Sequence, residues 1–466
     1  MTMFGSQWLA NAGASYEIEQ SIRFNDDDSA RLARTVSSSG SLTTWTLSGW
    51  IKRGKYTVNT NGQWFPVFSA SAGSTTYDAP LNFNDVSTGG AFNVTIGGYN
   101  WRTSALARDT SAWYHVVIVW DSTNGTASDR MRLYINGERV TAFSSSASPS
   151  SGANSRWNSS SYSHHRIGNL NYNGGETTYV FDGYLSEINF IDGTALDPTS
   201  FGEYNADGVW IPKAYSGSYG TNGFYVTGAT AADLGEDFSG NNNDFTSSGL
   251  ATTDQMLDTP TLNYPTLNPD VLYQAGLLLS DGNLDAFGSS GSNWNLIPAT
   301  MQIPSTGKWA FECTILSSAG YIMIGFASAE DINNFQGSGK YFSLMQNAGW
   351  LYNVETTKKV DGTSTNSGGL AGLTTNDVVE CMIDNDAGTM TFLKNGSAYA
   401  SLSGLNPLTQ PAITVYTNGV YRAKVDFGQI DYVPSDASYS AINSSTLPTP
   451  SITDGSAYFQ PTLYTG

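Results

Sequence analysis

The chain has 466 residues, of which 13% are charged and 13% aromatic, and its formal net charge is −19. Such an acidic chain repels a phosphate backbone, and it contains no basic run that would form a phosphate-binding patch, so we expect no nucleic-acid binding. Many aromatic residues together with few charges are typical of a folded β-protein and not of a disordered segment.

The N-terminal segment, residues 1–20, holds apolar side chains outside any alternating pattern. It lacks the basic stretch and apolar core of a secretory signal, and the chain has no run of roughly 18 apolar residues that would insert into a membrane. Exposed apolar residues in a terminal arm typically form a docking surface. The segment is therefore predicted to pack on a neighbouring subunit or on a later domain through Phe4, Trp8, Leu9 and Tyr16.

Residues 21–235 show short alternating runs separated by clusters of Gly, Asn, Asp and Ser. This spacing predicts an antiparallel β-sandwich. The clearest predicted strands are 44–51, 113–120, 131–136 and 180–191. After the third of these, Asn136-Gly137 predicts a type I′ hairpin, because both residue types tolerate the positive φ angles of that turn.

Residues 236–270 are rich in Pro, Asn and Asp with little alternation, which predicts an irregular connector. Alternation returns in residues 271–435 and predicts a second sandwich, with another hairpin at Asn395-Gly396. Its clearest predicted strands are 308–316, 320–327, 341–345, 378–384 and 389–394. The Pro-rich residues 436–466 are predicted to be extended. The fold class is therefore all-β, with two antiparallel β-sandwich (jelly-roll) domains and extended N- and C-terminal segments.

The cysteines and histidines favour structural roles. Cys313 and Cys381 alternate in phase with apolar neighbours, which predicts buried free thiols, with a disulfide between facing strands as the alternative. His115 lies within the apolar strand WYHVVIVW and is expected to pack there. The neighbours His164 and His165 would point to opposite faces of a strand, so they are not expected to share a metal.

Four stretches of the first half, LTTWTLSGWIKRG, SAWYHVVIVWD, RMRLYINGERV and FDGYLSEINFIDG, together resemble the laminin-G-like, concanavalin A-type jelly roll. The second half resembles a SPRY (B30.2-like) domain in GKWAFECTI, YIMIGFAS, NDVVECMIDNDAGTMTFLKNG and PAITVYTNGVYRAKVDFGQ. One departure is Glu380, where that family often has Gly.

GSQWLAN, INFIDGTALDPTSFGE, DFSGNNNDFT and YFQPTLYTG resemble segments of structural proteins from tailed, marine-type bacteriophages. The resemblance implies a virion component, assembled in the host cytoplasm and displayed as a tail fibre or tail-associated protein or as a capsid decoration. It also implies other virion proteins as partners. A homo-oligomer is expected, with a trimer as one option, although no heptad repeat supports it.

Glycoside hydrolases on this type of scaffold need two carboxylates that face one cleft. Glu17-Ile-Glu19 has the alternation but precedes the sandwich, whereas Glu187, Glu312 and Glu380 occur singly in the sequence. We therefore expect a protein that is not an enzyme, and a glycoside hydrolase is the least favoured alternative.

Glycan binding needs aromatic faces that stack on sugars and polar groups that bind hydroxyls. Loops 155–172 and 346–353 hold both kinds of residue. The candidate glycan-binding residues are Trp101, Trp157, Tyr162, Tyr172, Trp350 and Tyr352. The alternative for each is an aromatic ring that folds onto its own sandwich.

No cofactor is expected, although calcium is a weaker candidate ligand, because loop carboxylates and amides are its usual ligands. The candidates are Asp26 and Asp28 in one loop, and Asp237, Asn241 and Asp244 in another. The competing interpretation is that these side chains cap their own turns.

The expected function is that of a non-enzymatic virion surface protein that binds host polysaccharide or lipopolysaccharide for attachment. The alternative is a purely structural decoration, cement or fibre-adaptor subunit whose partners are other virion proteins.

Overall fold

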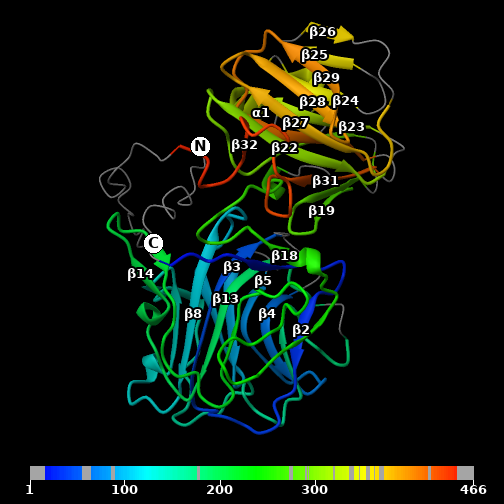
Figure 1. The fold of residues 1–466 in the computed structure, drawn as a ribbon. Coiled ribbons are helices and arrows are strands. Elements are labelled where there is room, and N and C mark those ends of the chain that lie inside the picture. The colour runs from blue at the N-terminus through cyan, green and yellow to red at the C-terminus, as the bar shows by residue number, and fades with distance from the viewer. Residues whose placement is uncertain are drawn as a thin grey trace.

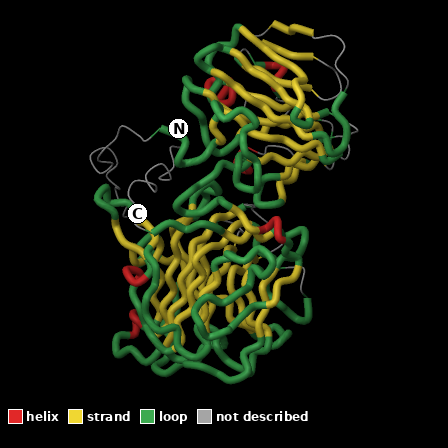
Figure 2. The backbone as a smooth tube through the Cα atoms, in the orientation of Figure 1, coloured by secondary structure: helices red, strands yellow, loops and turns green. Residues whose placement is uncertain are grey.

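The computed structural model describes residues 16–54, 64–84, 90–175, 179–271, 276–288, 291, 293–317, 321–334, 341–345, 347–352, 357–360, 363–366, 372–417 and 421–448. Strands dominate this part of the chain, and they form two sandwiches stacked end to end (Figure 2). The predicted all-β class with two antiparallel sandwich domains is confirmed.

The first domain contains two eight-stranded sheets (Figure 1). One sheet consists of β1 (Ser21–Phe24), β3 (Thr44–Arg53), β8 (Trp113–Asp121), β9 (Met131–Ile135), β10 (Glu138–Arg139), β13 (Gly183–Asp192), β16 (Phe224–Val226) and β18 (Gln255–Met256). Its order is β10-β9-β8-β3-β13-β1-β18, and β16 pairs with β13.

The other sheet consists of β2 (Arg31–Arg34), β4 (Trp64–Ser71), β5 (Tyr77–Asn84), β6 (Ala91–Ile96), β7 (Tyr99–Leu106), β11 (Phe143–Ser145), β12 (His164–Ile167) and β17 (Thr246–Ser248). Its order is β11-β7-β6-β5-β4-β12-β2-β17. The strands β14 (Gly202–Tyr204) and β15 (Trp210–Pro212) form a separate ribbon. Short 3₁₀ helices are η2 (Ala127–Asp129), η3 (Pro198–Ser200) and η4 (Thr252–Asp254).

The second domain pairs an eight-stranded with a six-stranded sheet. The larger sheet consists of β19 (Leu277–Ser280), β20 (Asp285–Gly288), β22 (Lys308–Ile315), β27 (Val378–Asp384), β28 (Thr389–Lys394), β29 (Ser397–Ser403), β31 (Tyr421–Asp426) and β32 (Ser440–Ala441). Its order is β19-β20-β31-β22-β27-β28-β29, and β32 pairs with β22.

The smaller sheet consists of β21 (Trp294–Pro298), β23 (Ile322–Ala327), β24 (Ala348–Tyr352), β25 (Thr357–Val360), β26 (Thr363–Asn366) and β30 (Gln410–Tyr416), in the order β21-β30-β23-β24-β25-β26. The domain also has η5 (Pro269–Val271), α1 (Ala329–Asn334) and η6 (Phe342–Leu344). The stretch 341–345 was predicted to be a strand, and it is instead centred on η6, so that prediction was wrong.

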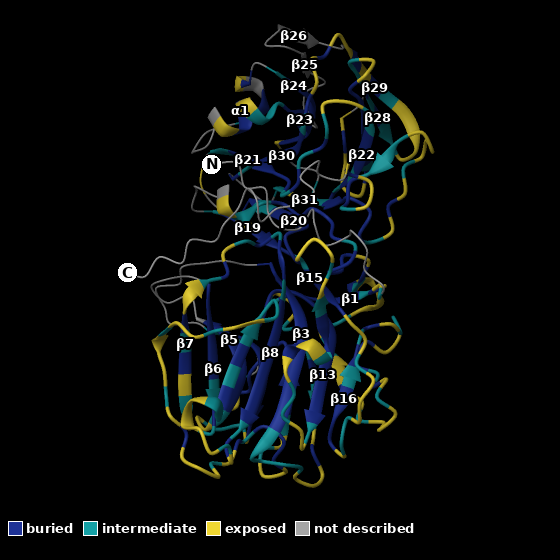
Figure 3. Cartoon of the chain, turned by 90° about the vertical axis from the view of Figure 1, so that its left-hand side faces the viewer, coloured by how far each residue is buried: buried dark blue, intermediate teal, exposed yellow. Residues whose placement is uncertain are grey.

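Each sandwich encloses its own apolar core, visible as the buried strands inside both halves of Figure 3. In the first domain the ring of Trp45 lies 5.9 Å from that of Phe190. In the second, Phe311 lies 5.3 Å from Phe326 and so joins the two sheets. Cys313 and Cys381 are buried free thiols, as predicted.

Both Asn-Gly hairpins have the predicted backbone. The φ angles are +50° at Asn136 and +82° at Gly137, and +49° at Asn395 and +73° at Gly396. All four values are positive, as a type I′ turn requires. The prediction of two such hairpins is therefore confirmed.

The domain boundaries differ in detail from the predicted ones. Strands β17 and β18 lie within residues 236–270, yet they pair with β2 and β1, so the first domain continues to Met256. Within the predicted C-terminal tail, β32 pairs with β22, and Leu447 is buried. Residues 449–466 lie outside the described residues. We call residues 257–268 the connector, because η5 of the second domain begins at Pro269.

The predicted docking arm is described only from Tyr16 onward, so Phe4, Trp8 and Leu9 lie outside the described residues. The hydroxyl of Tyr16 donates to Glu187 Oε2 at 2.9 Å, which places this end of the arm on the first domain. Within the described part of the chain, no helix is long and apolar enough to cross a membrane.

Candidate functional site

Three of the tryptophans predicted to bind glycans are in the apolar cores. Trp101, Trp157 and Trp350 are 4%, 1% and 3% exposed. Their rings therefore offer no face to a ligand, and the prediction was wrong for these three residues. Trp101 lies 6.5 Å from the ring of Trp120, and Trp350 belongs to a buried cluster with Phe342 and Met345.

Trp157 lies in a polar loop, but its ring is buried in the core. Its ring lies 6.3 Å from Phe68 and 5.8 Å from Phe190, inside the first sandwich. The buried carboxylate of Asp78 accepts hydrogen bonds from the backbone N of Arg156 at 2.6 Å and of Trp157 at 3.2 Å. This carboxylate holds the loop against the sheet and directs the indole inward.

The three predicted tyrosines have different positions. Tyr162 is half-buried against the core of the first domain. Tyr172 is also half-buried, with its ring 5.8 Å from Tyr77 and 5.5 Å from Tyr179, and these contacts hold its own loop on the sheet. Tyr352 ends β24, and its side chain lies outside the described residues.

A groove of about 610 Å³ opens in the first domain, where β12, β2 and β17 lie side by side. This polar groove is lined by Ala33, Arg34, Thr35, Ser37, Ser38, Ser163, His164, Thr221, Asn222, Asn242, Asn243, Asp244 and Thr246. Its volume lies within the range of about 300–1,000 Å³ that is usual for small-ligand sites. The loop predicted to bind glycans does reach it, but through Ser163 and His164 and not through its aromatic residues.

Arg34 supplies the guanidinium of the groove. Its Nη1 donates to the carbonyl of Asn222 at 3.1 Å, and its Nη2 donates to Asn243 Oδ1 at 2.5 Å. The guanidinium also lies 6.0 Å from the ring centre of Phe245. Burial lowers the pKa of Arg34, while nearby carboxylates oppose that shift, so the side chain keeps its charge. The fold therefore fixes this cation in place.

Behind the groove lies a small cavity of about 10 Å³, which Arg34 and Asn222 also line. His165 faces it. Its Nε2 accepts the backbone N–H of Asn158 at 3.1 Å, and burial lowers the pKa of the ring to about 3. In the neutral ring the proton then sits on Nδ1, which is buried and has no protein partner among the described residues.

Asp237, one of the predicted calcium ligands, organises its own loop. Its Oδ1 accepts the backbone N–H of Tyr225 at 2.8 Å and of Ser239 at 2.9 Å. Its Oδ2 accepts the backbone N–H of Asn243 at 2.8 Å. Both carboxylate oxygens thus accept backbone N–H groups of the turn. This is the capping role that the sequence offered as the alternative to calcium binding.

The other calcium candidates also make contacts within or beside their own loops; they are Asp26, Asp28, Asn241 and Asp244. Among the described residues, no three His, Cys, Asp or Glu side chains lie together so as to hold a metal ion. Calcium at either loop stays a prediction.

His115 is packed in its strand, and its hydrogen bonds specify one tautomer. The indole N–H of Trp210 donates to His115 Nδ1 at 2.9 Å, so this nitrogen carries no proton. The proton of the neutral ring is therefore on Nε2, which donates to Ser48 Oγ at 2.9 Å. In this arrangement His115 is a donor to the serine and not the base that nucleophilic catalysis requires.

Tertiary structure brings together three acidic residues that are isolated in the sequence. Glu312 lies opposite Glu380 on β27 and opposite Asp426 on β31. Tyr432 donates to Glu380 at 2.8 Å, and the backbone N–H of Gly428 donates to Asp426 at 2.8 Å. Two of the three carboxylates thus anchor the segment that follows β31, which argues against a pair working as acid and base.

The second domain carries a cluster of partly exposed aromatic rings. This aromatic platform consists of Trp294, Tyr321, Tyr341, Tyr416 and Tyr421. Trp294 is central, with ring centres 5.6 Å from Tyr321 and 5.1 Å from both Tyr341 and Tyr416. Tyr321 is 40% exposed. No local pattern in the sequence predicts this platform, because its members come from separate stretches of the chain.

Comparisons with known proteins divide the chain in the same way. Residues 24–200 match the family model of the concanavalin A-like lectin/glucanases superfamily, and residues 308–419 match that of the SPRY domain. One matched range falls in each sandwich.

Among solved structures, the SPRY domain of human HERC1 is 13% identical, with a TM-score of 0.29, and the match covers 36% of this chain and 99% of that one. A human SPRY domain is 14% identical, with coverages of 34% and 98% and a TM-score of 0.26. The TRIM65 PSpry domain is 12% identical, with coverages of 35% and 89% and a TM-score of 0.29.

Proposed function

Because the chain carries a concanavalin A-like domain followed by a SPRY domain, we propose that it is a non-enzymatic bacteriophage surface protein that binds host glycans. The pair of domains supports a binding role in general. The phage assignment is supported by the short segments that resemble virion proteins. Within the virion, tail and capsid positions are both compatible with this role, and the partners would be other virion proteins.

The polar groove carries the proposal of glycan binding. Six of its side chains bear hydroxyls, namely Thr35, Ser37, Ser38, Ser163, Thr221 and Thr246. Three more are amides, which donate and accept hydrogen bonds as sugar hydroxyls do. Arg34 and Asp244 carry opposite charges, and the chain as a whole has a net charge of −19. A neutral, hydroxyl-rich segment of polysaccharide or of a lipopolysaccharide sugar chain fits this chemistry best.

A glycan array followed by calorimetric titration tests the proposal. Thr221→Ala with Thr246→Ala removes two exposed hydroxyls of the groove and is expected to weaken binding about tenfold, at ~0.5–1.5 kcal/mol per hydrogen bond. The matched control is Thr75→Ala with Thr252→Ala, which removes exposed hydroxyls outside the groove. Binding of no neutral glycan, or equal affinity in both double variants, would contradict the proposal.

The aromatic platform favours a second function, which is docking onto other virion proteins. Clustered exposed aromatic rings are enriched at protein interfaces. Tyr321→Ser with Tyr341→Ser would remove two of its rings. If particles then incorporate less of the protein while its glycan binding stays intact, the platform has a structural role. Unchanged incorporation would argue against docking through this surface.

A further inference from the structure

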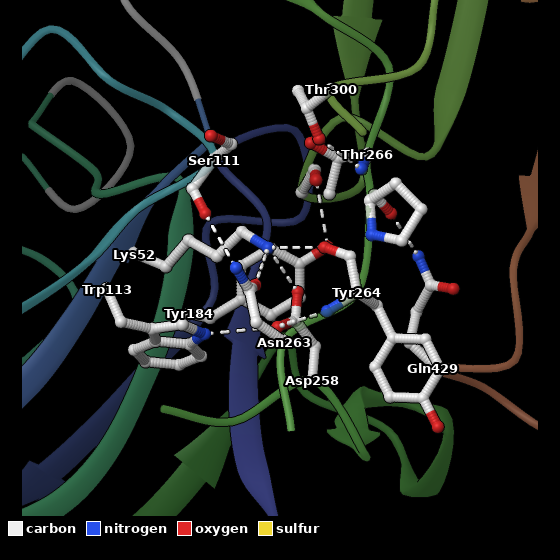
Figure 4. Close-up of polar contacts among 12 residues, drawn as sticks. Lys52, Ser111, Trp113, Tyr184, Asp258, Asn263, Tyr264, Thr266, Thr300 and Gln429 are labelled. Atoms are coloured by element: carbon white, nitrogen blue, oxygen red, sulfur yellow. Dashed lines mark hydrogen bonds and ion pairs between the residues drawn. The ribbon is translucent and has the colours of Figure 1, made fainter. Parts of the chain in front are cut away.

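The two domains meet across a buried polar centre and not across a flexible linker. Figure 4 shows Lys52 of β3 surrounded by groups of the connector. The ammonium Nζ donates to Asp258 Oδ2 at 2.6 Å, to Asn263 Oδ1 at 2.8 Å and to the carbonyl of Tyr264 at 2.8 Å. The side chains of Lys52 and Asp258 are both 0% exposed. All three donors of the ammonium are thus used without water.

The carboxylate of Asp258 also has hydrogen-bond partners for both of its oxygens. Its Oδ1 accepts the indole N–H of Trp113 at 3.1 Å and the backbone N–H of Tyr264 at 3.3 Å. Its backbone carbonyl accepts the hydroxyl of Ser21 at 2.6 Å. Strands β1, β3 and β8 of the first domain therefore all hold this residue of the connector.

The connector is held equally firmly by the second domain. The backbone N–H of Thr300 donates to the carbonyl of Thr266 at 2.8 Å, and that of Asn268 donates to the carbonyl of Pro298 at 2.9 Å. Gln429 Nε2 donates to the carbonyl of Pro265 at 3.0 Å. Each domain thus bonds to the same short segment.

Direct contacts between the domains surround this centre. The hydroxyl of Tyr184 donates to the carbonyl of Gly282 at 2.8 Å, and Arg23 Nη2 lies 3.0 Å from Asp281 Oδ1. Trp50, Trp113 and Tyr184 also belong to the same buried apolar cluster as the core of the second domain. The apolar core therefore continues across the junction.

We propose that this junction makes the two domains one rigid unit that unfolds cooperatively, with the buried Lys52–Asp258 pair specifying the angle between them. Domains joined in one chain usually move relative to each other unless their interface is large and apolar. A buried ion pair adds little net stability, because desolvation offsets its attraction, but it penalises any arrangement that leaves one partner unpaired. The angle between the domains is therefore the one at which Lys52 and Asp258 remain paired.

The consequence concerns the two candidate surfaces. A rigid junction holds the polar groove and the aromatic platform at one separation and orientation. Once one of these surfaces has bound, the other can bind the same virion or host surface without the entropy loss of ordering a linker. The inference does not depend on which ligand either surface binds.

Calorimetry and small-angle X-ray scattering of the full chain test it without any ligand. The wild type is expected to show one thermal transition and scattering that a single domain arrangement fits. Lys52→Met leaves Asp258 buried without its cation, and it is expected to lower Tm by about 5 °C or more. Lys52→Met with Asp258→Asn removes both charges but keeps an oxygen that can accept from Trp113 and Tyr264. This double variant is expected to recover part of that Tm and to broaden the distribution of interatomic distances.

The control is an exposed ion pair of the same length. Arg139 Nη2 lies 2.6 Å from Asp129 Oδ1, and these side chains are 39% and 31% exposed. Arg139→Met is expected to leave Tm and scattering unchanged, because exposed pairs contribute little. Two separate transitions in the wild type, or scattering that needs several domain arrangements, would overturn the proposal. These two wild-type measurements test whether the domains form one rigid unit even if Lys52→Met does not fold.

Discussion

The carboxylate of Glu380 accepts a hydrogen bond of 2.8 Å from the hydroxyl of Tyr432, 52 residues later in the chain. It also accepts the backbone N–H of Ser435 at 2.9 Å and its hydroxyl at 2.5 Å. This glutamate was the departure from the SPRY pattern, which often has Gly at that position. In the structure, Glu380 attaches the C-terminal segment to the larger sheet of the second domain.

Glu380→Gln is expected to destabilise the protein by about 2 kcal/mol, because hydrogen bonds to a charged group contribute roughly 1.5–3 kcal/mol. The measurement is urea unfolding followed by tryptophan fluorescence. The control is Glu138→Gln, which removes the carboxylate that accepts the hydroxyl of Tyr204 at 2.7 Å on the exposed surface. Equal effects in the two variants would show that the anchor contributes no more than a surface contact.

Glu312 is expected to make stability fall as pH rises toward 7. Burial, and then the charges of Asp426, Asp431 and Glu380, raise the pKa of Glu312 from 4.5 to about 7. The folded state therefore binds the proton more tightly than the unfolded state, so this contribution is complete below pH 4.5 and is lost as pH rises to about 7.

Glu312→Gln removes this dependence by keeping the side chain neutral. At pH 8 the variant is expected to be more stable than the wild type by about 1 kcal/mol, after allowance for the partial exposure of the side chain. At pH 4 the two should be equal. Urea unfolding at both pH values measures the difference, with the exposed Glu330→Gln as control. A variant that is less stable at pH 8 would contradict the assignment.

His115 is expected to stay neutral with its proton on Nε2 throughout the range from pH 8 to pH 4. Burial lowers the pKa of His115 from 6.5 to about 3. Its contribution to stability is therefore complete above pH 6.5 and is lost as pH falls toward 3. Nitrogen-15 NMR of the imidazole distinguishes the two tautomers directly. A protonated Nδ1 would show that Trp210 does not donate to this ring.

A single ordered water is expected in the small cavity beside His165. The cavity volume of about 10 Å³ is near the minimum that holds one water, and the buried Nδ1–H supplies a donor. A crystal structure at high resolution would show density within hydrogen-bond distance of Nδ1. His165→Phe removes the donor and should remove the water. An empty cavity in the wild type would contradict the predicted water.

The architecture could be predicted because its signals are local. Alternation located β3, β8, β27 and β28 to within a few residues, and the Asn-Gly pairs specified two turns whose φ angles only a few residue types adopt readily. The stretch 341–345, YFSLM, is apolar except for Ser343, but it is centred on η6. Periodicity over five residues is too short to decide between a strand and a turn of helix.

The candidate sites could not be predicted to the same extent. Trp157 lies in a polar loop, and the carboxylate of Asp78, 79 residues earlier, accepts its backbone N–H and so helps to hold it at the core. The polar groove combines residues near positions 35, 163, 221 and 244. No local pattern in the sequence predicts that these segments lie side by side.

The sequence by itself determined the two sandwiches, their hairpins and the buried thiols, because strand periodicity and turn preferences depend on neighbouring residues. Tertiary structure alone decided which aromatic rings remain exposed, where the groove opens, and that Lys52 meets Asp258. Those outcomes depend on contacts between residues far apart in the chain, where burial in the assembled fold outweighs the local character of each segment.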